Sequence, residues 1–287
     1  MARRIAVVTT SLLLICSCLS APATALAVTD TPNDIPTCFG EPATVVGTSR
    51  ADTLEGTVGS DVIVTFSGAD WVNARGGKDL LCLGSGGDHA EGGRGLDRIR
   101  GGRGEDDLFG DGGGSYLFGG RGNDHFFGGR NQDRIWGGRG DDDFNLSLGH
   151  DVAHGGHGAH DWLGLYDSRH GVTVNLKDGT LKGGTADVIS GIEDVQGSRF
   201  ADRLVGNARA NYLRGASGDD VIVGRRGRDR IGGFGGHDLL HGGAGKDSLA
   251  GRGGEDLLDG GKGLADNLWG GKGNDSCVNG SWMVRCE

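Results

Sequence analysis

Proline and long apolar runs are scarce in this sequence, and each scarcity excludes a class of protein. Only 4 of the 287 residues are proline, and the 61 glycines do not recur at every third position, so a collagen triple helix is excluded. The apolar fraction of 36% is too lean for one large globular core. Beyond the N-terminal segment, no apolar run is long enough to cross a membrane. Frequent glycine also disfavours helices, so a repeat stack with a thin shared core fits the composition best.

Positive charge is in deficit, because 39 acidic residues face 29 basic ones and give a net charge of −10. Nucleic-acid binding is driven by basic residues, so the sequence predicts a cation as ligand and no nucleic-acid partner. The sequence also lacks a G-x-S-x-G elbow and a histidine–carboxylate arrangement outside its repeats. We therefore expect no enzymatic activity.

The N-terminus predicts export. Arg3 and Arg4 precede an apolar stretch over residues 5–19, and Ala-Leu-Ala at 25–27 is a small-x-small cleavage signal. This pattern is typical of a secretory signal peptide, with the mature chain starting near Val28, whereas Cys18 leaves a lipoprotein alternative open. The predicted location is extracellular, either free or at the cell surface.

Four cysteines remain after cleavage at this site: Cys38, Cys82, Cys277 and Cys286. An even number in an exported chain predicts two disulfides, for which three connectivities exist. We favour Cys38–Cys82 and Cys277–Cys286, because each pair brackets one end of the repeat array and a crosslink there would limit fraying.

A nine-residue period dominates the rest of the chain. Read in nines from Gly47, the sixth place is almost always aspartate, the eighth is apolar and glycine occupies turn positions. The pattern predicts a short strand of three residues per repeat, joined by glycine-rich turns. The period lapses over residues 166–196, where Val172, Val174 and Leu176 alternate with polar residues and indicate a strand. The predicted segments are 1–27 (signal peptide), 28–46 (N-terminal cap), 47–165 (first block), 166–196 (insert), 197–278 (second block) and 279–287 (C-terminal cap).

Repeats such as GGRGEDDLF, GGRGNDHFF and GGAGKDSLA resemble the RTX, or hemolysin-type, calcium-binding nonapeptide GGxGxDxUx of secreted bacterial proteins, in which U is a large apolar residue. The resemblance covers most of residues 47–278 and implies an all-β fold, a parallel β-roll (β-solenoid) with two nonapeptides per turn. It also implies multiple calcium ions, each lying between repeats n and n+2 on the same edge. Stacked carboxylates would repel one another without metal, so we expect folding to be coupled to calcium.

Carried onto this chain, the resemblance predicts these metal-binding residues: Asp88, Asp97, Asp106, Asp124, Asp133, Asp142, Asp161, Asp220, Asp229, Asp238, Asp247, Asp256, Asp266 and Asp275. The tightest sites are expected in GGRGED, GGRGND and GGRGDD. Ser115 and Asn211 replace the carboxylate and weaken their sites. The simpler alternative is that the aspartates only cap turns.

Two other groups stand out. Phe109, Phe118, Phe127 and Trp136 occupy the ninth place of four successive repeats, so alternate members should stack about 4.8 Å apart, either to stabilise the sheets or to hold a polysaccharide or protein partner. Five histidines cluster near the end of the first block, either as solvated loop residues or as a transition-metal site: His150, His154, His157, His160 and His170. The alternative function is a carbohydrate-active or hydrolytic enzyme that uses the surface of the roll near these histidines.

Overall fold

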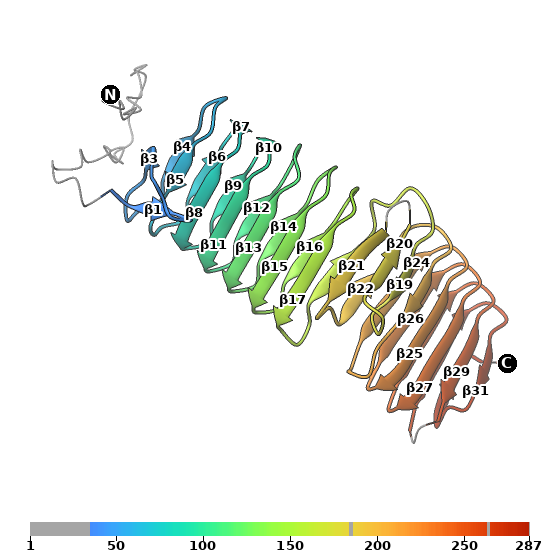
Figure 1. Ribbon diagram of the computed structural model, residues 1–287. Helices are drawn as coiled ribbons and strands as arrows, with labels where there is room; N and C mark the ends of the chain where they lie inside the picture. The colour runs from blue at the N-terminus through green and yellow to red at the C-terminus, as the bar shows by residue number, and fades with distance from the viewer. Residues whose placement is uncertain (1–34, 184–185, 263–264, 287) are drawn as a thin grey trace, which may run out of the picture.

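In the computed structural model, the chain is a long stack of parallel strands that runs from the N-terminal to the C-terminal end (Figure 1). The structure describes residues 35–183, 186–262 and 265–286, so the predicted signal peptide lies outside the described residues. The described residues form strands and turns without a helix, and therefore include no helix that could span a membrane. The predicted all-β solenoid is confirmed.

Two long sheets form the opposite faces of the stack. The 15-stranded sheet contains, in spatial order, β3 (Val45–Val46), β5 (Val62–Val64), β8 (Leu80–Ser85), β11 (Arg98–Arg103), β13 (Tyr116–Arg121), β15 (Arg134–Arg139), β17 (Val152–His157), β21 (Ala186–Ser190), β20 (Thr180–Lys182), β19 (Thr173–Asn175), β23 (Arg203–Val205), β25 (Val221–Gly227), β27 (Leu239–Gly245), β29 (Leu257–Gly261) and β31 (Ser276–Val278).

The 13-stranded sheet contains β4 (Thr53–Glu55), β6 (Trp71–Asn73), β9 (His89–Glu91), β12 (Asp107–Phe109), β14 (His125–Phe127), β16 (Asp143–Asn145), β18 (Trp162–Gly164), β22 (Asp194–Gln196), β24 (Tyr212–Ser217), β26 (Arg230–Gly235), β28 (Ser248–Gly253), β30 (Asn267–Lys272) and β32 (Trp282–Val284). Two short pairs complete the described strands: β1 (Thr37–Cys38) with β2 (Glu41–Pro42), and β7 (Gly76–Gly77) with β10 (Arg94–Gly95).

The register of the sheets follows from the nine-residue period. Ile99 on β11 pairs with Leu117 on β13, and Leu117 pairs with Ile135 on β15, so each turn of the solenoid takes 18 residues, or two repeats. Most eighth-place side chains, these three included, are fully buried and form one continuous core between the sheets. Because side chains alternate along a strand, the seventh and ninth places face outward.

The insert interrupts the parallel pairing without interrupting the core. β19, β20 and β21 form an antiparallel meander that fits into the 15-stranded sheet. The strand predicted from Val172, Val174 and Leu176 is present as β19, and the buried side chains of Ile189, Ile192 and Val195 continue the core.

The ends of the stack carry both favoured disulfides, Cys38–Cys82 and Cys277–Cys286. At the N-terminal end, the β1–β2 hairpin lies against the 15-stranded sheet, and Phe39 approaches Phe118 with ring centroids 6.0 Å apart. At the C-terminal end, the segment predicted as a cap contains β32, which adds the last strand of the 13-stranded sheet and leaves Trp282 68% exposed.

Candidate metal sites

The sixth-place aspartates form two columns, one along each turn edge of the stack. On one edge the N–H of Asp106 donates to Oδ1 of Asp124 at 3.0 Å, and the N–H of Asp124 donates to Oδ1 of Asp142 at 2.9 Å. On the other edge the N–H of Asp133 donates to Oδ1 of Asp151 at 2.8 Å. Each Oδ1 therefore caps the preceding turn of the solenoid, which is a structural role that needs no metal.

The second carboxylate oxygen, Oδ2, has a different environment. In all fourteen aspartates predicted to bind metal, Oδ2 is buried and has no hydrogen-bond partner among the described residues. Asp70, Asp79 and Asp151, which the sequence prediction omitted, have the same unpaired atom. A buried carboxylate oxygen without a donor is costly, so this repeated atom indicates a ligand position for a cation.

The first-place glycine of each regular repeat leaves space beside this oxygen. A Cβ added to Gly119 would lie 2.1 Å from Oδ2 of Asp124 and 2.8 Å from the carbonyl oxygen of Gly137, the first-place glycine of the next turn. The same arrangement recurs at Gly137, where the nearest oxygens belong to Asp142 and Gly155. A glycine here keeps open a space lined by a carboxylate oxygen and a backbone carbonyl oxygen, which are the ligand types that calcium prefers.

Burial raises the pKa of these carboxyl groups far above their usual range. The pKa of Asp124 rises to about 7 and that of Asp133 to about 8, although the backbone N–H that each accepts lowers it in part. Neighbouring aspartates in the Asp124 column raise its pKa further. Without a cation, the columns must therefore either bind protons or accept strong repulsion between carboxylates.

Two turns depart from this regular arrangement. Leu83, a buried core residue, replaces the leading glycine of the Asp88 turn. Ser115 is buried and its hydroxyl donates to the carbonyl of Gly110 at 3.3 Å, so the opposite column lacks a carboxylate at that level. The Asp88 turn thus lacks the first-place glycine, and the Ser115 turn lacks the carboxylate, that the regular turns around Asp124 have.

Four turns satisfy the sixth-place side chain internally. Ser198 donates its N–H to Oδ2 of Asp202 at 2.6 Å and its hydroxyl to Oδ1 at 2.8 Å. Thr48 and Thr57 do the same for Asp52 and Asp61, and the N–H of Asn207 donates to Asn211 at 2.9 Å. These turns open the first and second blocks. The sequence signal, which our prediction did not use, is a first-place glycine followed by a hydroxyl or amide residue at the second place.

Both columns continue from the first block into the insert, where the sequence prediction expected the repeat to lapse. The N–H of Asp151 donates to Oδ1 of Asp187 at 3.0 Å, and the N–H of Asp161 lies 3.4 Å from Oε2 of Glu193. Both acidic residues are buried, and each precedes an apolar residue by two places, as in the regular repeat. An acidic residue two places before an apolar one, without the glycines, was therefore the sequence signal that could have predicted these two positions.

The family model for the RTX calcium-binding nonapeptide repeat matches residues 46–81, 84–117, 118–153, 196–231, 232–263 and 265–281, which together are more than half of the chain. The chain belongs to the RTX calcium-binding nonapeptide repeat family. No curated protein matches it at a significant level. The RTX match ends near residue 153 and resumes near 196, so it omits the insert through which the carboxyl columns continue.

The buried oxygens fit the calcium that the RTX family binds. Calcium takes six to eight oxygen ligands at flexible geometry. Within the part of the chain that the structure describes, no three His, Cys, Asp or Glu side chains are grouped to hold a metal ion. Each RTX site would therefore combine carboxylate oxygens with backbone carbonyls of the glycine-rich turns, rather than rely on carboxylates alone.

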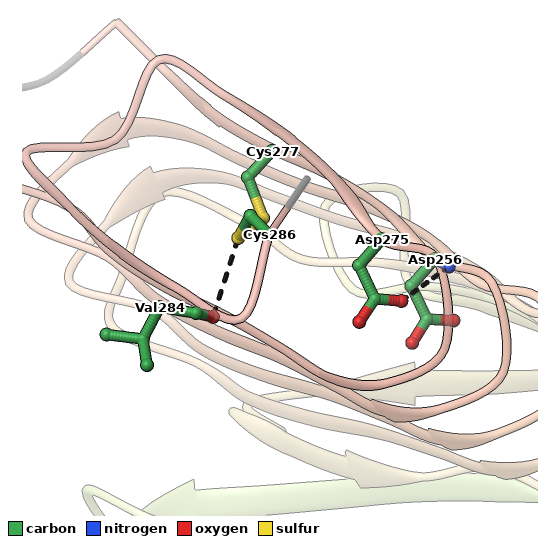
Figure 2. Close-up of a disulfide and its surroundings, with 5 residues drawn as sticks. All are labelled: Asp256, Asp275, Cys277, Val284 and Cys286. Carbon is green, nitrogen blue, oxygen red and sulfur yellow. Dashed lines mark hydrogen bonds between the residues drawn. A yellow bond between two sulfur atoms is a disulfide. The ribbon is translucent and has the colours of Figure 1, made fainter.

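The last sites of the RTX array lie beside the C-terminal disulfide. Figure 2 shows Asp256 and Asp275 on neighbouring turns, close to Cys277 and Cys286, with the N–H of Asp256 donating to Oδ1 of Asp275 at 3.0 Å. Cys277 follows Asp275 by two residues and takes the inward eighth place. The crosslink therefore anchors β31, the strand that directly follows Asp275, the final carboxylate of its column.

The aromatic residues divide between the two faces of the roll. Phe109 and Phe127 stack on the 13-stranded sheet with centroids 4.5 Å apart, and Phe118 and Trp136 stack on the 15-stranded sheet at 4.7 Å. The predicted stacking is present. Since the pairs lie on opposite faces and each pair covers its own ring surfaces, the four rings do not form one platform.

The clustered histidines contact separate partners. His154 Nδ1 lies 2.5 Å from the hydroxyl of Ser190, His160 Nδ1 lies 3.0 Å from Oδ2 of Asp194, and His150 Nδ1 lies 3.3 Å from the carbonyl of Ala186. They do not form a shared metal centre within the described residues.

Proposed function

We propose that this protein is a secreted RTX β-roll whose folding depends on calcium, and that it has a structural or binding role at or outside the cell surface. The observation that carries the proposal is the column of buried, unpaired Oδ2 atoms beside first-place glycines. Carboxylates one strand apart, about 4.8 Å, repel by about 3–4 kcal/mol per neighbouring pair at an effective dielectric constant near 20. Calcium between the turns would replace this repulsion with attraction.

The thin core supports the same conclusion. A typical repeat contributes only one or two buried apolar side chains to the stack, whereas ordering the backbone costs about 1–2 kcal/mol per residue. Metal binding would supply the missing stability, as in small metallo-domains that fold only with their ion. Extracellular calcium modules bind with a Kd of about 10⁻⁴ to 10⁻³ M, so the chain would stay unfolded inside the cell and fold after export. The two disulfides are consistent with an oxidising compartment.

The test is a calcium titration of the purified mature chain, followed by far-UV circular dichroism, with metal content measured on the same sample. We expect β-sheet signal to appear cooperatively with calcium, and several ions per chain. Full β-sheet signal in excess chelator would overturn the proposed coupling.

A hydrolytic enzyme is a second candidate, because His154 and Ser190 form a close imidazole–hydroxyl pair on the 15-stranded sheet. No carboxylate of the described residues is hydrogen-bonded to His154, so the third member of a catalytic triad is missing from the contacts of this pair. We therefore propose that the protein has no enzymatic activity. Turnover in a hydrolase panel that His154→Ala abolishes would favour the enzyme instead.

A further inference from the structure

Three arginines lie in one row along the edge where the strands of the 15-stranded sheet end. Arg103, Arg121 and Arg139 are the last residues of β11, β13 and β15, and they pair in register, so neighbours are about one strand spacing (4.8 Å) apart. All three side chains are exposed. Among the described residues, their guanidinium groups make no ion pair, hydrogen bond or cation–π contact.

This row is unusual in a protein with a net charge of −10. Two like charges at this spacing repel by about 1 kcal/mol even in water. The nearest acidic residues in sequence, Glu105 and Asp141, stand two places after Arg103 and Arg139, yet neither comes within the 4.0 Å of an ion pair. No direct partner therefore neutralises the positive charge of the row. A ligand with regularly spaced negative charges would neutralise it.

The row lines an open groove of about 680 Å³. The second-place glycines, such as Gly102, Gly120 and Gly138, form its floor, and all three adopt left-handed backbone conformations with φ between +118° and +123°. They bring no side chains into the groove, so an extended polymer can approach the backbone. His157 lines one end and Phe66 the other.

Phe66 occupies a place that is glycine in the following turns of this row. Its φ of 73° lies in the left-handed region, which costs an aromatic residue about 1–3 kcal/mol, and its side chain is 47% exposed. Its ring makes no aromatic or cation–π contact within the described residues. In contrast to Phe118 and Trp136, whose faces cover each other, Phe66 offers a free ring face. Such a face suits the apolar side of a sugar ring.

We propose that this arginine groove, defined by Phe66, Arg103, Arg121, Arg139 and His157, binds a linear acidic polysaccharide. The planar guanidinium groups match uronate carboxylates in bidentate pairs, and one sugar ring lies on Phe66. Carboxylates on one edge of the polymer face the row of arginines. A nucleic acid fits less well, because its dense phosphate charge would be repelled by the acidic remainder of the chain. The inference rests on the proposed function, since it names the partner class of the binding role.

The test is isothermal titration calorimetry in calcium with β-1,4-linked hexaglucuronate, and with cellohexaose as the uncharged oligomer of the same linkage. We expect binding of the first and not of the second. Arg121→Gln should weaken binding about three- to tenfold, and the triple Arg103→Gln, Arg121→Gln, Arg139→Gln variant should abolish it. Phe66→Gly, which suits the left-handed backbone, should weaken binding about three- to tenfold. Arg130→Gln, an exposed arginine of the opposite edge, is the matched control and should change nothing.

Three outcomes would overturn the inference: no binding of hexaglucuronate to the folded wild type, equal binding by the triple variant, or tighter binding of an oligothymidylate than of hexaglucuronate. Circular dichroism of every sample, with calcium and with chelator, separates the two proposals. A chain that is folded in chelator refutes calcium-coupled folding, and titration of that chain with hexaglucuronate still tests whether the arginine groove binds the polymer. A chain that folds only with calcium and ignores hexaglucuronate refutes the groove alone.

Discussion

Asp124→Asn should change stability in opposite directions with and without calcium. Asparagine keeps the Oδ1 atom that accepts the N–H of Asp106 at 3.0 Å, so the turn cap is preserved. It replaces the unpaired Oδ2 by an amide, which can donate to the nearby carbonyl of Gly137. The chain already contains such a case, because the amide of Asn211 donates to the carbonyl of Glu193 at 2.8 Å.

The two magnitudes follow from separate observations. In chelator at neutral pH, the Asp124 pKa of about 7 against an ordinary 3.8 corresponds to at most about 4 kcal/mol of destabilisation, and burying the new amide costs part of what is recovered. We expect a net stabilisation of about 1–3 kcal/mol. At a calcium concentration ten to a hundred times Kd, loss of one site removes about 1.4–2.7 kcal/mol.

Urea unfolding followed by circular dichroism, in calcium and in chelator, measures both effects. Asp202→Asn is the matched control, since Ser198 already satisfies the carboxylate of Asp202 and its substitution should have the same effect in both conditions. If Asp124→Asn is equally neutral with and without calcium, the aspartates only cap turns and the metal assignment is refuted.

Three further predictions use other parts of the molecule. Ser198→Gly removes the hydroxyl that caps Asp202 and should destabilise the second block by about 1.5–3 kcal/mol in chelator, as measured by urea unfolding. A loss of stability that is seen only in calcium would contradict the role of Ser198 as a local cap. In chelator, acid should stabilise the fold, because the folded pKa of residues such as Asp133 (about 8) exceeds the ordinary 3.8. Their stabilising contribution is complete below about pH 4 and is lost as pH rises towards 8, which circular dichroism against pH would show. A fold most stable at about pH 8 in chelator would contradict this prediction. Cys286→Ser opens a nine-residue crosslink and should lower the local stability of the C-terminal end by about 2–3 kcal/mol, visible as faster amide exchange in β31 and β32. Unchanged exchange would mean that β32 holds the end in place without the disulfide.

The period of the sequence was enough to predict short strands with an inward eighth place, and the resemblance to RTX repeats supplied the two nonapeptides per turn that set the register. Asp106, Asp124 and Asp142 lie at the same depth because they take the same place in that register. Asp151 was missed because its repeat, LSLGHDVAH, has lost the leading glycines, although its aspartate keeps the phase. The nine-residue phase therefore predicts the members of the columns better than the presence of the leading glycines does.

The insert could not be predicted in the same way, because antiparallel pairing of β19, β20 and β21 depends on contacts between residues far from the repeat phase. Asp187 and Glu193 enter the columns because β21, which contains Asp187, and β22, which follows Glu193, pair in parallel with β17 and β18 at the end of the first block. The unpaired row of arginines is likewise a property of the register: third-place residues 18 apart in sequence become neighbours only once the turns are stacked.

The two kinds of turn together suggest where folding starts. Turns headed by Thr48 or Thr57 at the first block, and by Ser198 or Asn207 at the second, satisfy their own sixth-place side chains, whereas the turns of the aspartates predicted to bind metal leave an oxygen unpaired. Each block therefore begins with about one full turn of the solenoid that does not need a cation. A stack grows by adding turns to an existing end, so a first turn that needs no cation can provide that end. Under the proposed coupling of folding to calcium, the order of the repeats along the chain matches an order of assembly: capped turns first, calcium-dependent turns after them.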